Sequence, residues 1–505
     1  MISRVNSGII LALVSCLILE TGKAADGPAA AGPATEAKTL LLGNYADPTI
    51  VKDGNDYYMT HSSFQYQPGL LVWHSTDLLN WTPISRAVVN QSGSIWAPDI
   101  IKHDGRFYIY YPADGDNWVV TAGDPHGPWS EPVSLGVGRI DPGHIASPDG
   151  KRYLHLSAGN ALVLSQDGLK AETEMRTVYD GWPIPEDWAV ECPCLESPKL
   201  NFRNGWYYMT SAQGGTAGVT TSHMVVAARS KNPLGPWTNS PYNPILRTWD
   251  RDEKWWSKGH GTIVEGPGGQ WYCVLHGYRN GYRSLGRATI MEPIEWTSDG
   301  WYRRSPGNPP DWDVPVTINM PTRDEFDGNE LGIQWQFDEH YDASRFEISD
   351  GALTLKAYGD DPGSSRPLFV MPMNRAYEVT TEFEIDDGAT AGLMLFASSG
   401  TYIGTGLSGD GKLHRVQEGF RRYARHEAKP EVNTKRITLR IVNNKQDVRF
   451  YYMDSQKQWR ILTPSMDVSS ANHNVTGGWA TLCPGVFVTG KGQARFHSFE
   501  YRGLD

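Results

Sequence analysis

The chain has 505 residues, a formal net charge of -11 and a pI near 5.7. This length exceeds one ordinary hydrophobic core, so we expect two domains. The acidic balance argues against a nucleic-acid surface, which needs a basic stripe. The 19 Trp and 24 Tyr, together with 53 Gly and 33 Pro, favour a turn-rich β protein over a helical one.

The first 24 residues have the pattern of an export signal peptide. Arg4 precedes an apolar run that is too short to span a bilayer, and small residues follow it. Lipoprotein anchoring at Cys16, within LVSC, is the alternative. Either interpretation predicts a secreted or periplasmic protein with no transmembrane segment. Residues 25–40 are rich in Ala, Gly and Pro, so we expect a flexible linker there.

Between residues 41 and 315 one sequence pattern recurs five times. Each copy has an apolar run, a turn with a polar residue and a glycine, and an aromatic run such as YYMTHS or WYYMTS. The turn glycines are 45–64 residues apart, at Gly54, Gly105, Gly150, Gly205 and Gly269. Hairpins repeated at this interval predict a five-bladed β-propeller, whereas a β-sandwich would not repeat its pattern in this way.

Equivalent positions in a propeller form a ring around the central channel. Nine residues before the turn glycine, blades two to five carry Trp96, Asp141, Glu196 and His260. In blade one the nearest acid, Asp47, lies seven residues before its glycine. We expect all of these side chains at one mouth of the channel.

Carboxylates gathered at one site repel one another, which raises the pKa of at least one of them. Glycoside hydrolysis uses such a pair, one protonated and one ionised. Taken singly, Asp47 and Asp141 precede proline and could be ordinary turn residues, and we interpret Asp99 as structural. Glu191 competes with Glu196 as the acid, but only Glu196 keeps the nine-residue spacing.

These motifs resemble glycoside hydrolase family 43. The matching segments are YADPTIVKDGNDYYM, SIWAPDIIKHDGRFYIYY, RIDPGHI, LESPKLNFRNGWYYMTSAQGGT, SKGHGTIVEGPGGQWYCVLHGY and LGRATIMEPIEW. They occur in order across the whole predicted propeller. Fructan-cleaving propellers are a related alternative, but they carry an NDPNG-like segment where this chain has YADPTI.

The resemblance implies a role for each acid at the predicted rim. Asp47 would be the general base, Glu196 the general acid, and Asp141 the residue that tunes and orients that acid. Arg287 would bind the hydroxyls of the terminal sugar. His260 would help to hold a structural calcium ion or a water on the propeller axis, with no cofactor needed for the chemistry.

We also expect two tryptophans, Trp73 and Trp96, to contact the sugar. After residue 322 the sequence alternates apolar and polar residues in short runs up to residue 505, which predicts a β-sandwich. This part resembles the concanavalin-like domain of the xylosidase and arabinofuranosidase branch, where that domain can narrow the mouth of the active site. Sugar binding by the domain itself is the alternative.

Taken with this resemblance, the sequence predicts a secreted, exo-acting, inverting glycosidase. It would release terminal β-D-xylose or α-L-arabinofuranose from hemicellulose or its oligosaccharides. The alternatives are an endo-arabinanase and a propeller lectin that binds pentosans without cleaving them. The oligomeric state is left open, as is the pairing of four cysteines: Cys192, Cys194, Cys273 and Cys483.

Overall fold

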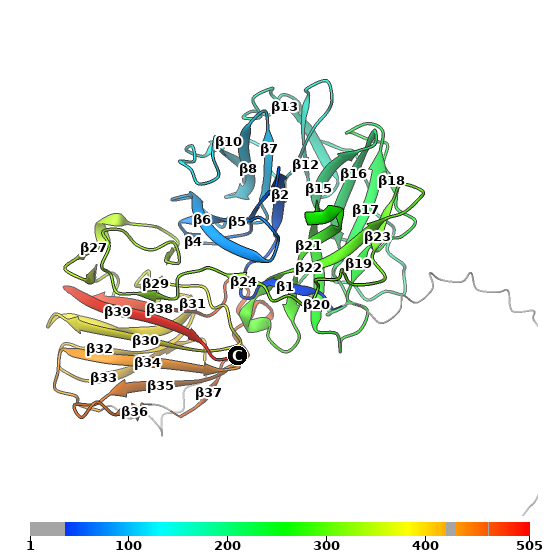
Figure 1. Ribbon diagram of the computed structural model, residues 1–505. Helices are drawn as coiled ribbons and strands as arrows, with labels where there is room; N and C mark the ends of the chain where they lie inside the picture. Colours follow the sequence, from blue (N-terminus) through cyan, green and yellow to red (C-terminus); the bar gives the residue numbers. More distant parts are fainter. Residues whose placement is uncertain (1–35, 421–429, 463) are drawn as a thin grey trace, which may run out of the picture. The chain divides into compact units, whose positions relative to one another are not determined.

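The computed structural model describes residues 36–420, 430–462 and 464–505 (Figure 1). The predicted export signal, including Cys16, and most of the predicted linker lie outside these residues. No helix in the described ranges is long and apolar enough to cross a membrane. Regular structure in these ranges is almost entirely β-strand, and their one α-helix is the short α1 (His473–Thr476).

Five sheets build the propeller, one for each predicted blade. The first contains β2 (Thr49–Asp53), β3 (Asp56–Thr60), β5 (Gly69–Ser75), β6 (Asn80–Val88) and β24 (Thr317–Ile318). The second contains β7 (Asp99–His103), β8 (Arg106–Ala113), β9 (Asp116–Ala122) and β10 (Val133–Ser134). The third contains β11 (Gly143–Ala146), β12 (Arg152–Leu156), β13 (Asn160–Leu164) and β14 (Arg176–Thr177).

The last two blades have the longest inner strands. The fourth contains β15 (Glu196–Arg203), β16 (Trp206–Gln213), β17 (Met224–Ser230), β18 (Thr238–Asn239) and β19 (Leu246–Arg247). The fifth contains β20 (Trp255–Glu265), β21 (Trp271–Arg279), β22 (Arg287–Trp296), β23 (Tyr302–Arg304) and the N-terminal β1 (Lys38–Leu41).

The first strands of the blades line the central channel. Strands β2, β7, β11, β15 and β20 contact one another in that order, and β20 also contacts β2, which closes the ring. The predicted five-bladed propeller is therefore confirmed, and it occupies the blue-to-green part of the chain in Figure 1.

Strand β1 corrects the boundary of the linker expected over residues 25–40. It pairs with β22 through Lys38 and Met291, and Leu40 and Leu41 are buried in a core that contains residues of the first and fifth blades. The N-terminal strand thereby joins the last blade. These two consecutive leucines provide the apolar surface that fixes it there.

The polar-Gly turns form the expected tight hairpins. At the ends of β7 and β15, Asp104–Gly105 and Asn204–Gly205 each place two successive residues at positive φ. This is the conformation of a type I′ turn, which Asp-Gly and Asn-Gly sequences favour. The turns lie at one end of each blade, so the residues that precede the inner strands gather at the other end.

The C-terminal part is the predicted β-sandwich. One sheet contains β27 (Phe346–Ser349), β28 (Ala352–Lys356), β39 (Gln493–Gly503), β30 (Ala376–Ile385), β34 (Arg436–Asn444), β35 (Asp447–Met453) and β36 (Trp459–Ile461), with β25 (Arg323–Asp324) and β37 (Met466–Asp467) at its margins. The other contains β33 (Leu413–Glu418), β32 (Thr401–Ser408), β31 (Ala389–Ser398), β38 (Cys483–Gly490), β29 (Leu368–Phe369) and β26 (Gln336–Asp338). Strand β30 alternates buried and half-buried residues, as a sheet with one face on a core should.

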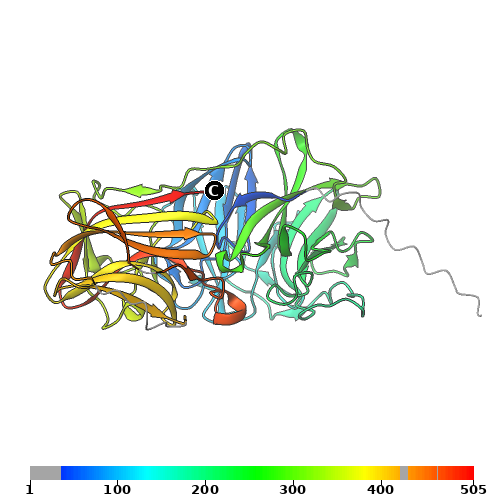
Figure 2. The same ribbon diagram turned by 90° about the horizontal axis from the view of Figure 1, so that it is seen from below.

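The propeller and the sandwich share hydrogen bonds. Strand β4 (Tyr66–Gln67) belongs to the first blade by sequence, yet it pairs with β26 and extends a sandwich sheet. The segment that follows α1 also reaches the propeller, because Asn44 Nδ2 donates to the carbonyl of Trp479 at 2.7 Å. In Figure 2 the orange-red α1 lies beside the propeller strands.

Candidate active site

The ring positions predicted from the repeat lie at one end of the channel. Asp47 and Asp141 come shortly before β2 and β11, Glu196 begins β15, and His260 lies in β20 beside a register shift. Asp47, Asp141 and His260 all have φ between 51° and 60°. Left-handed backbone at non-glycine residues is strained and is concentrated at functional sites.

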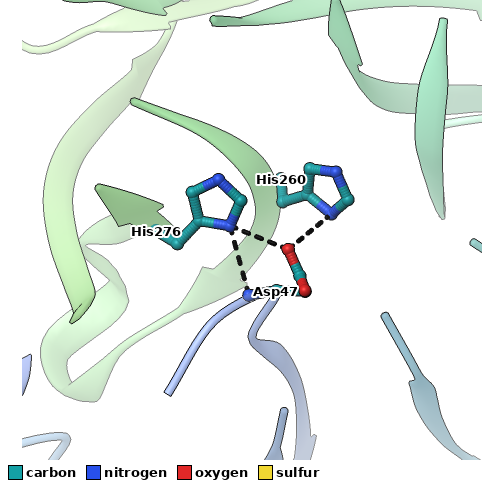
Figure 3. A group of neighbouring side chains, drawn as sticks. All are labelled: Asp47, His260 and His276. Atoms are coloured by element: carbon teal, nitrogen blue, oxygen red, sulfur yellow. Dashed lines mark hydrogen bonds and ion pairs between the residues drawn. The ribbon is translucent and has the colours of Figure 1, made fainter. Parts of the chain in front are cut away.

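Asp47 is almost completely buried among cationic and polar groups. Its Oδ1 lies 2.8 Å from Nη1 of Arg287 and 2.9 Å from Nδ1 of His276, and its Oδ2 accepts a hydrogen bond of 2.5 Å from Ser62. Nδ1 of His260 lies 3.3 Å from the same Oδ1. Figure 3 shows both imidazole rings directed at this carboxylate.

His260 connects the two sides of the site. While its Nδ1 faces Asp47, its Nε2 lies 3.1 Å from Oε1 of Glu196 and 3.7 Å from Oδ2 of Asp141. Asp141 also accepts a hydrogen bond of 3.2 Å from the backbone N–H of Ser197. One imidazole ring therefore separates Asp47 from the other two carboxyl groups.

The surroundings shift the pKa values of these groups in different directions. Burial alone would raise the pKa of Asp47, but the adjacent Arg287, followed by His260, outweighs burial and holds that pKa well below its usual range. Burial alone would lower the pKa of His260. The neighbouring carboxylates, Asp47 first, reverse this and raise it to about 9.

Asp141 behaves in the opposite way to Asp47. Burial raises its pKa to about 7, against the opposing charge of His260, and the neighbouring carboxylate of Glu196 raises it further. The side of His260 that faces Asp47 therefore favours an ionised carboxylate, whereas burial on the other side favours the protonated form of Asp141 up to about neutral pH.

A cavity of about 290 Å³ opens onto these groups. This lies near the lower limit of the about 300–1,000 Å³ that is common for small-molecule sites, which suits a small ligand. Its lining includes the three acids, His260 and Arg287, as well as Phe64, Trp96, Glu191, Thr216 and Trp479. Trp96 therefore lies where a sugar contact was expected.

Trp73 does not line this cavity, which corrects its expected role as a sugar contact. Its side chain is fully buried in the core of the first blade and its ring packs edge-on against Tyr45. Its indole N–H donates to Nε2 of His61 at 3.2 Å. The large apolar surface of this tryptophan stabilises the blade instead.

The remaining part of the cavity wall comes from the sandwich domain. Trp479 lies 4.4 Å from the guanidinium of Arg287, a cation–π distance, and stacks on His473 with ring centroids 3.7 Å apart. Its backbone is held by Asn44 of the propeller. The C-terminal domain thus contributes an aromatic side chain directly to the site.

Two family models match the chain. Residues 38–302 match glycosyl hydrolases family 43, and residues 323–502 match the beta xylosidase C-terminal concanavalin A-like domain. The chain belongs to glycosyl hydrolase family 43. It is therefore a glycosidase, with a propeller followed by a concanavalin-like domain.

Relatives cover almost the whole chain. A non-reducing end alpha-L-arabinofuranosidase of Bacteroides ovatus is 29% identical over 92% of this chain and 94% of its own. A beta-xylosidase of Bacillus subtilis is 25% identical over 89% of this chain and 94% of its own. The crystal structure of a xylan beta-1,4-xylosidase from Bacillus halodurans is similar with a TM-score of 0.81 and 25% identity, covering 93% of this chain and all of that one.

In this family 43 glycosidase, Glu191 and Glu196 differ in their surroundings. Oε2 of Glu191 accepts hydrogen bonds of 2.9 and 2.8 Å from the backbone N–H groups of Ala217 and Gly218. Glu196 instead faces His260. The disulfide between Cys192 and Cys194 lies between the two glutamates, while Cys273 and Cys483 are buried free thiols.

The donor groups around His260 do not fit calcium. Two groups of residues could offer metal ligands in the described ranges, Asp47–His260–His276 and Glu196–His223–His260. Each supplies two imidazole nitrogens and one carboxylate, whereas calcium takes six to eight oxygen ligands. The calcium expectation stays a prediction, and no chemical step here depends on a metal.

Sequence reasoning missed several residues that touch the site. His276 ends an apolar run that the repeat had identified, so its place at the catalytic end could have been noted. Ser62 follows the aromatic strand of the first blade in a similar way. Trp479 carried no such signal, because it lies more than 180 residues beyond Arg287 in an irregular segment.

Proposed function

We propose that this protein is an exo-acting, inverting pentosidase that releases terminal β-D-xylose or α-L-arabinofuranose from hemicellulose or its oligosaccharides. The observation that carries the proposal is the position of Asp47 and Glu196 at opposite nitrogens of His260, at one small cavity. Their environments differ in charge and exposure, as acid–base catalysis requires.

Asp47 acts as the general base. Arg287 keeps it ionised, so it can take a proton from a water that attacks the anomeric carbon. The ring of His260 lies between Oδ1 of Asp47 and Oε1 of Glu196 and keeps these two oxygens apart. Inverting enzymes hold their carboxyl groups about 6.5–9.5 Å apart to admit that water, and a separation by one imidazole ring supports this class.

Glu196 acts as the general acid. Its side chain is 18% exposed at the cavity, against 3% for Asp141, so it can reach a glycosidic oxygen. Burial raises the pKa of Asp141 to about 7 and the neighbouring Glu196 raises it further, so Asp141 can hold a proton beside the acid up to about neutral pH. Asp141 stays behind the acid, where its charge state controls the proton of Glu196.

Arg287 binds the sugar hydroxyls while it pairs with Asp47. Its guanidinium lies between that carboxylate and the ring of Trp479, which leaves its remaining N–H groups for the ligand. Trp96 and Trp479, on different parts of the wall, supply aromatic surface for the apolar face of a sugar ring.

Exo-cleavage is supported by the small cavity and by Trp479, which the sandwich domain adds to its wall. The relatives named above as a non-reducing end alpha-L-arabinofuranosidase and a beta-xylosidase support terminal release of a pentose. An endo-arabinanase needs a groove that is open at both ends, which fits this wall less well. A lectin has no need of a buried carboxyl with a raised pKa, Asp141, near a carboxylate whose pKa is lowered, Asp47.

We also propose that the protein acts outside the cytoplasm. The N-terminal 24 residues have the pattern of an export signal. The disulfide between Cys192 and Cys194 supports this location, because structural disulfides persist in oxidising compartments.

One assay tests the proposed reaction. The protein is incubated with aryl β-D-xylopyranoside and aryl α-L-arabinofuranoside, and the anomer that is released first is followed by NMR. We expect turnover of at least one substrate with inversion, and a loss of about 10²–10⁴-fold in Glu196→Ala and in Asp47→Ala. Initial release of the retained anomer would refute the mechanism, and undiminished turnover in both variants would refute the site.

A further inference from the structure

The exposed tryptophans of the described residues gather at one end of the propeller. Of the large hydrophobic side chains that are strongly exposed there, two are tryptophans: Trp96 at 37% and Trp249 at 60%. Trp96 lines the catalytic cavity, whereas Trp249 does not. A tryptophan exposed to this extent presents a large, rigid apolar ring that the face of a sugar can cover.

Trp249 belongs to a cluster of three indoles and one guanidinium. Its ring meets Trp188 edge-on with centroids 5.6 Å apart, and Trp188 in turn lies 5.8 Å from Trp182. The guanidinium of Arg247 lies 3.6 Å from the ring of Trp188 and 5.3 Å from that of Trp249. These contacts hold the exposed ring of Trp249 in a fixed orientation.

Hydrogen bonds fasten the cluster to the fourth blade. Gln213, the last residue of β16, accepts from the backbone N–H of Trp182 at 2.8 Å and donates to its carbonyl at 3.1 Å. Nε of Arg247 donates to the carbonyl of Thr221 at 2.8 Å. The rings are therefore organised before any ligand binds, which lowers the entropy cost of binding.

The cluster lies at the catalytic end of the blade. Gln213 pairs with Met224, Met224 pairs with Arg247, and the neighbouring Ala212 pairs with Glu196. The chain then leads from the cluster into the cavity, since Glu191, three residues after Trp188, is a lining residue. The backbone N–H of Glu191 donates a hydrogen bond to the carbonyl of Gly214 at 3.1 Å.

We propose that Trp249, supported by Trp188 and Arg247, is a second sugar-binding site for the part of the substrate that extends out of the cavity. This rests on the proposed function. When a small cavity holds the terminal pentose, the leaving-group side of an oligosaccharide must pass over the surface around the mouth. A rigid aromatic ring binds the C–H face of a neutral sugar by apolar contact, with no charged partner needed. The ligand class is a pentose oligosaccharide of three or more units.

The test compares substrates of different length in Trp249→Ala. The substrates are β-1,4-linked xylo-oligosaccharides and α-1,5-linked arabino-oligosaccharides of two to six units, together with the two aryl glycosides. The readout is the ratio of kcat/KM for the longest active oligosaccharide to kcat/KM for the aryl glycoside. We expect this ratio to fall about tenfold, the size of one lost aromatic contact.

Phe202→Ala is the matched control. Phe202 is 44% exposed and lies in the same blade, near the turn end of β15. Its removal should leave the ratio unchanged. Trp249→Phe keeps an aromatic ring and should restore part of the ratio. A melting curve for each variant shows that the blade is folded.

The outcomes separate this proposal from the proposed function. If the wild-type protein hydrolyses no aryl pentoside, the proposed function is wrong. If it does, and the ratio is the same in Trp249→Ala as in the wild type, the second sugar site is wrong. An equal fall in Phe202→Ala would also overturn it, because the effect would then not depend on the catalytic end of the blade.

Discussion

Lys199 and Asp99 form a buried ion pair in the channel of the propeller, with Nζ 3.3 Å from Oδ1. The lysine also donates to the carbonyl of Pro98 at 2.6 Å and to that of Pro142 at 2.8 Å. Pro142 follows Asp141 directly, so one cation joins three blades and acts on a catalytic carboxyl without lining the active-site cavity. Its positive charge lowers the pKa of Asp141 against the effect of burial.

Replacing this lysine should therefore move the alkaline limb of the pH profile upward. The acid side of the site loses a proton as Asp141 ionises, so kcat/KM should fall as pH rises through the Asp141 pKa of about 7. In Lys199→Met this pKa rises, and the fall should begin at a higher pH. A limb that stays in place or moves down would contradict the assignment.

The same substitution leaves Asp99 buried without its partner, which should cost about 3–5 kcal/mol of unfolding free energy. The double variant Lys199→Met with Asp99→Asn removes both charges and should recover part of that stability. Because it is expected to be more stable than Lys199→Met, the double variant is also better suited to the pH measurement. Lys231→Met, at the turn end of the fourth blade, is the control, since Lys231 contacts only the carbonyl of Gly205 among the hydrogen bonds described.

Arg287 should control the acidic limb of the pH profile of kcat/KM. Its guanidinium, which opposes the effect of burial, holds the pKa of Asp47 well below the usual range. The base must be ionised, so activity is lost as pH falls through this pKa. In Arg287→Met the pKa rises and the acidic limb should move to higher pH, together with a higher KM. The check is kcat/KM from pH 3 to pH 7.

Arg152→Met serves as the control for the loss of a buried arginine. Arg152 is 1% exposed and donates to His144 in the third blade and to Tyr110 in the second, away from Asp47. The Arg152→Met variant can lose stability, but the acidic limb of its pH profile should stay where it is in the wild type. Equal movement of the limb in both variants would show that the effect comes from loosened packing.

The two glutamates of the ECPCLE segment should differ in their effect on rate. Glu196→Gln removes the proton donor and should lower kcat by about 10²–10⁴-fold. In Glu191→Gln the amide oxygen can still accept from the backbone N–H groups of Ala217 and Gly218, so we expect a loss below about tenfold. Steady-state kinetics on the better aryl glycoside decide between them, and the reverse order would transfer the role of the acid to Glu191.

Trp479 should govern how tightly the terminal sugar is held. Removal of its ring in Trp479→Ala takes away the apolar cover of Arg287 and widens the cavity, so KM should rise about tenfold. Chromatography of oligosaccharide products should then show some internal cleavage. Products that remain exclusively monosaccharides would show that other walls enforce exo-cleavage.

Much of this site could be predicted from the repeat alone. Since each blade copies one hairpin, residues at a fixed distance from the turn glycine occupy equivalent positions, and this placed Asp141, Glu196 and His260 together. Trp73 was assigned wrongly because successive residues of a strand point to opposite faces. The position of a tryptophan along a strand does not by itself show whether its side chain faces the channel or the next blade.

Sequence by itself determined the propeller, the sandwich and the ring of acids, because these depend on local turn chemistry, alternating hydrophobicity and periodic spacing. Only the tertiary structure decided the partners of the acids. His276 and Arg287 reach Asp47 because β20 and β21 of the last blade contact β2 of the first blade, where the ring closes. Trp479 reaches the same site from another domain. Such contacts join residues that are distant in sequence, and no local pattern encodes them.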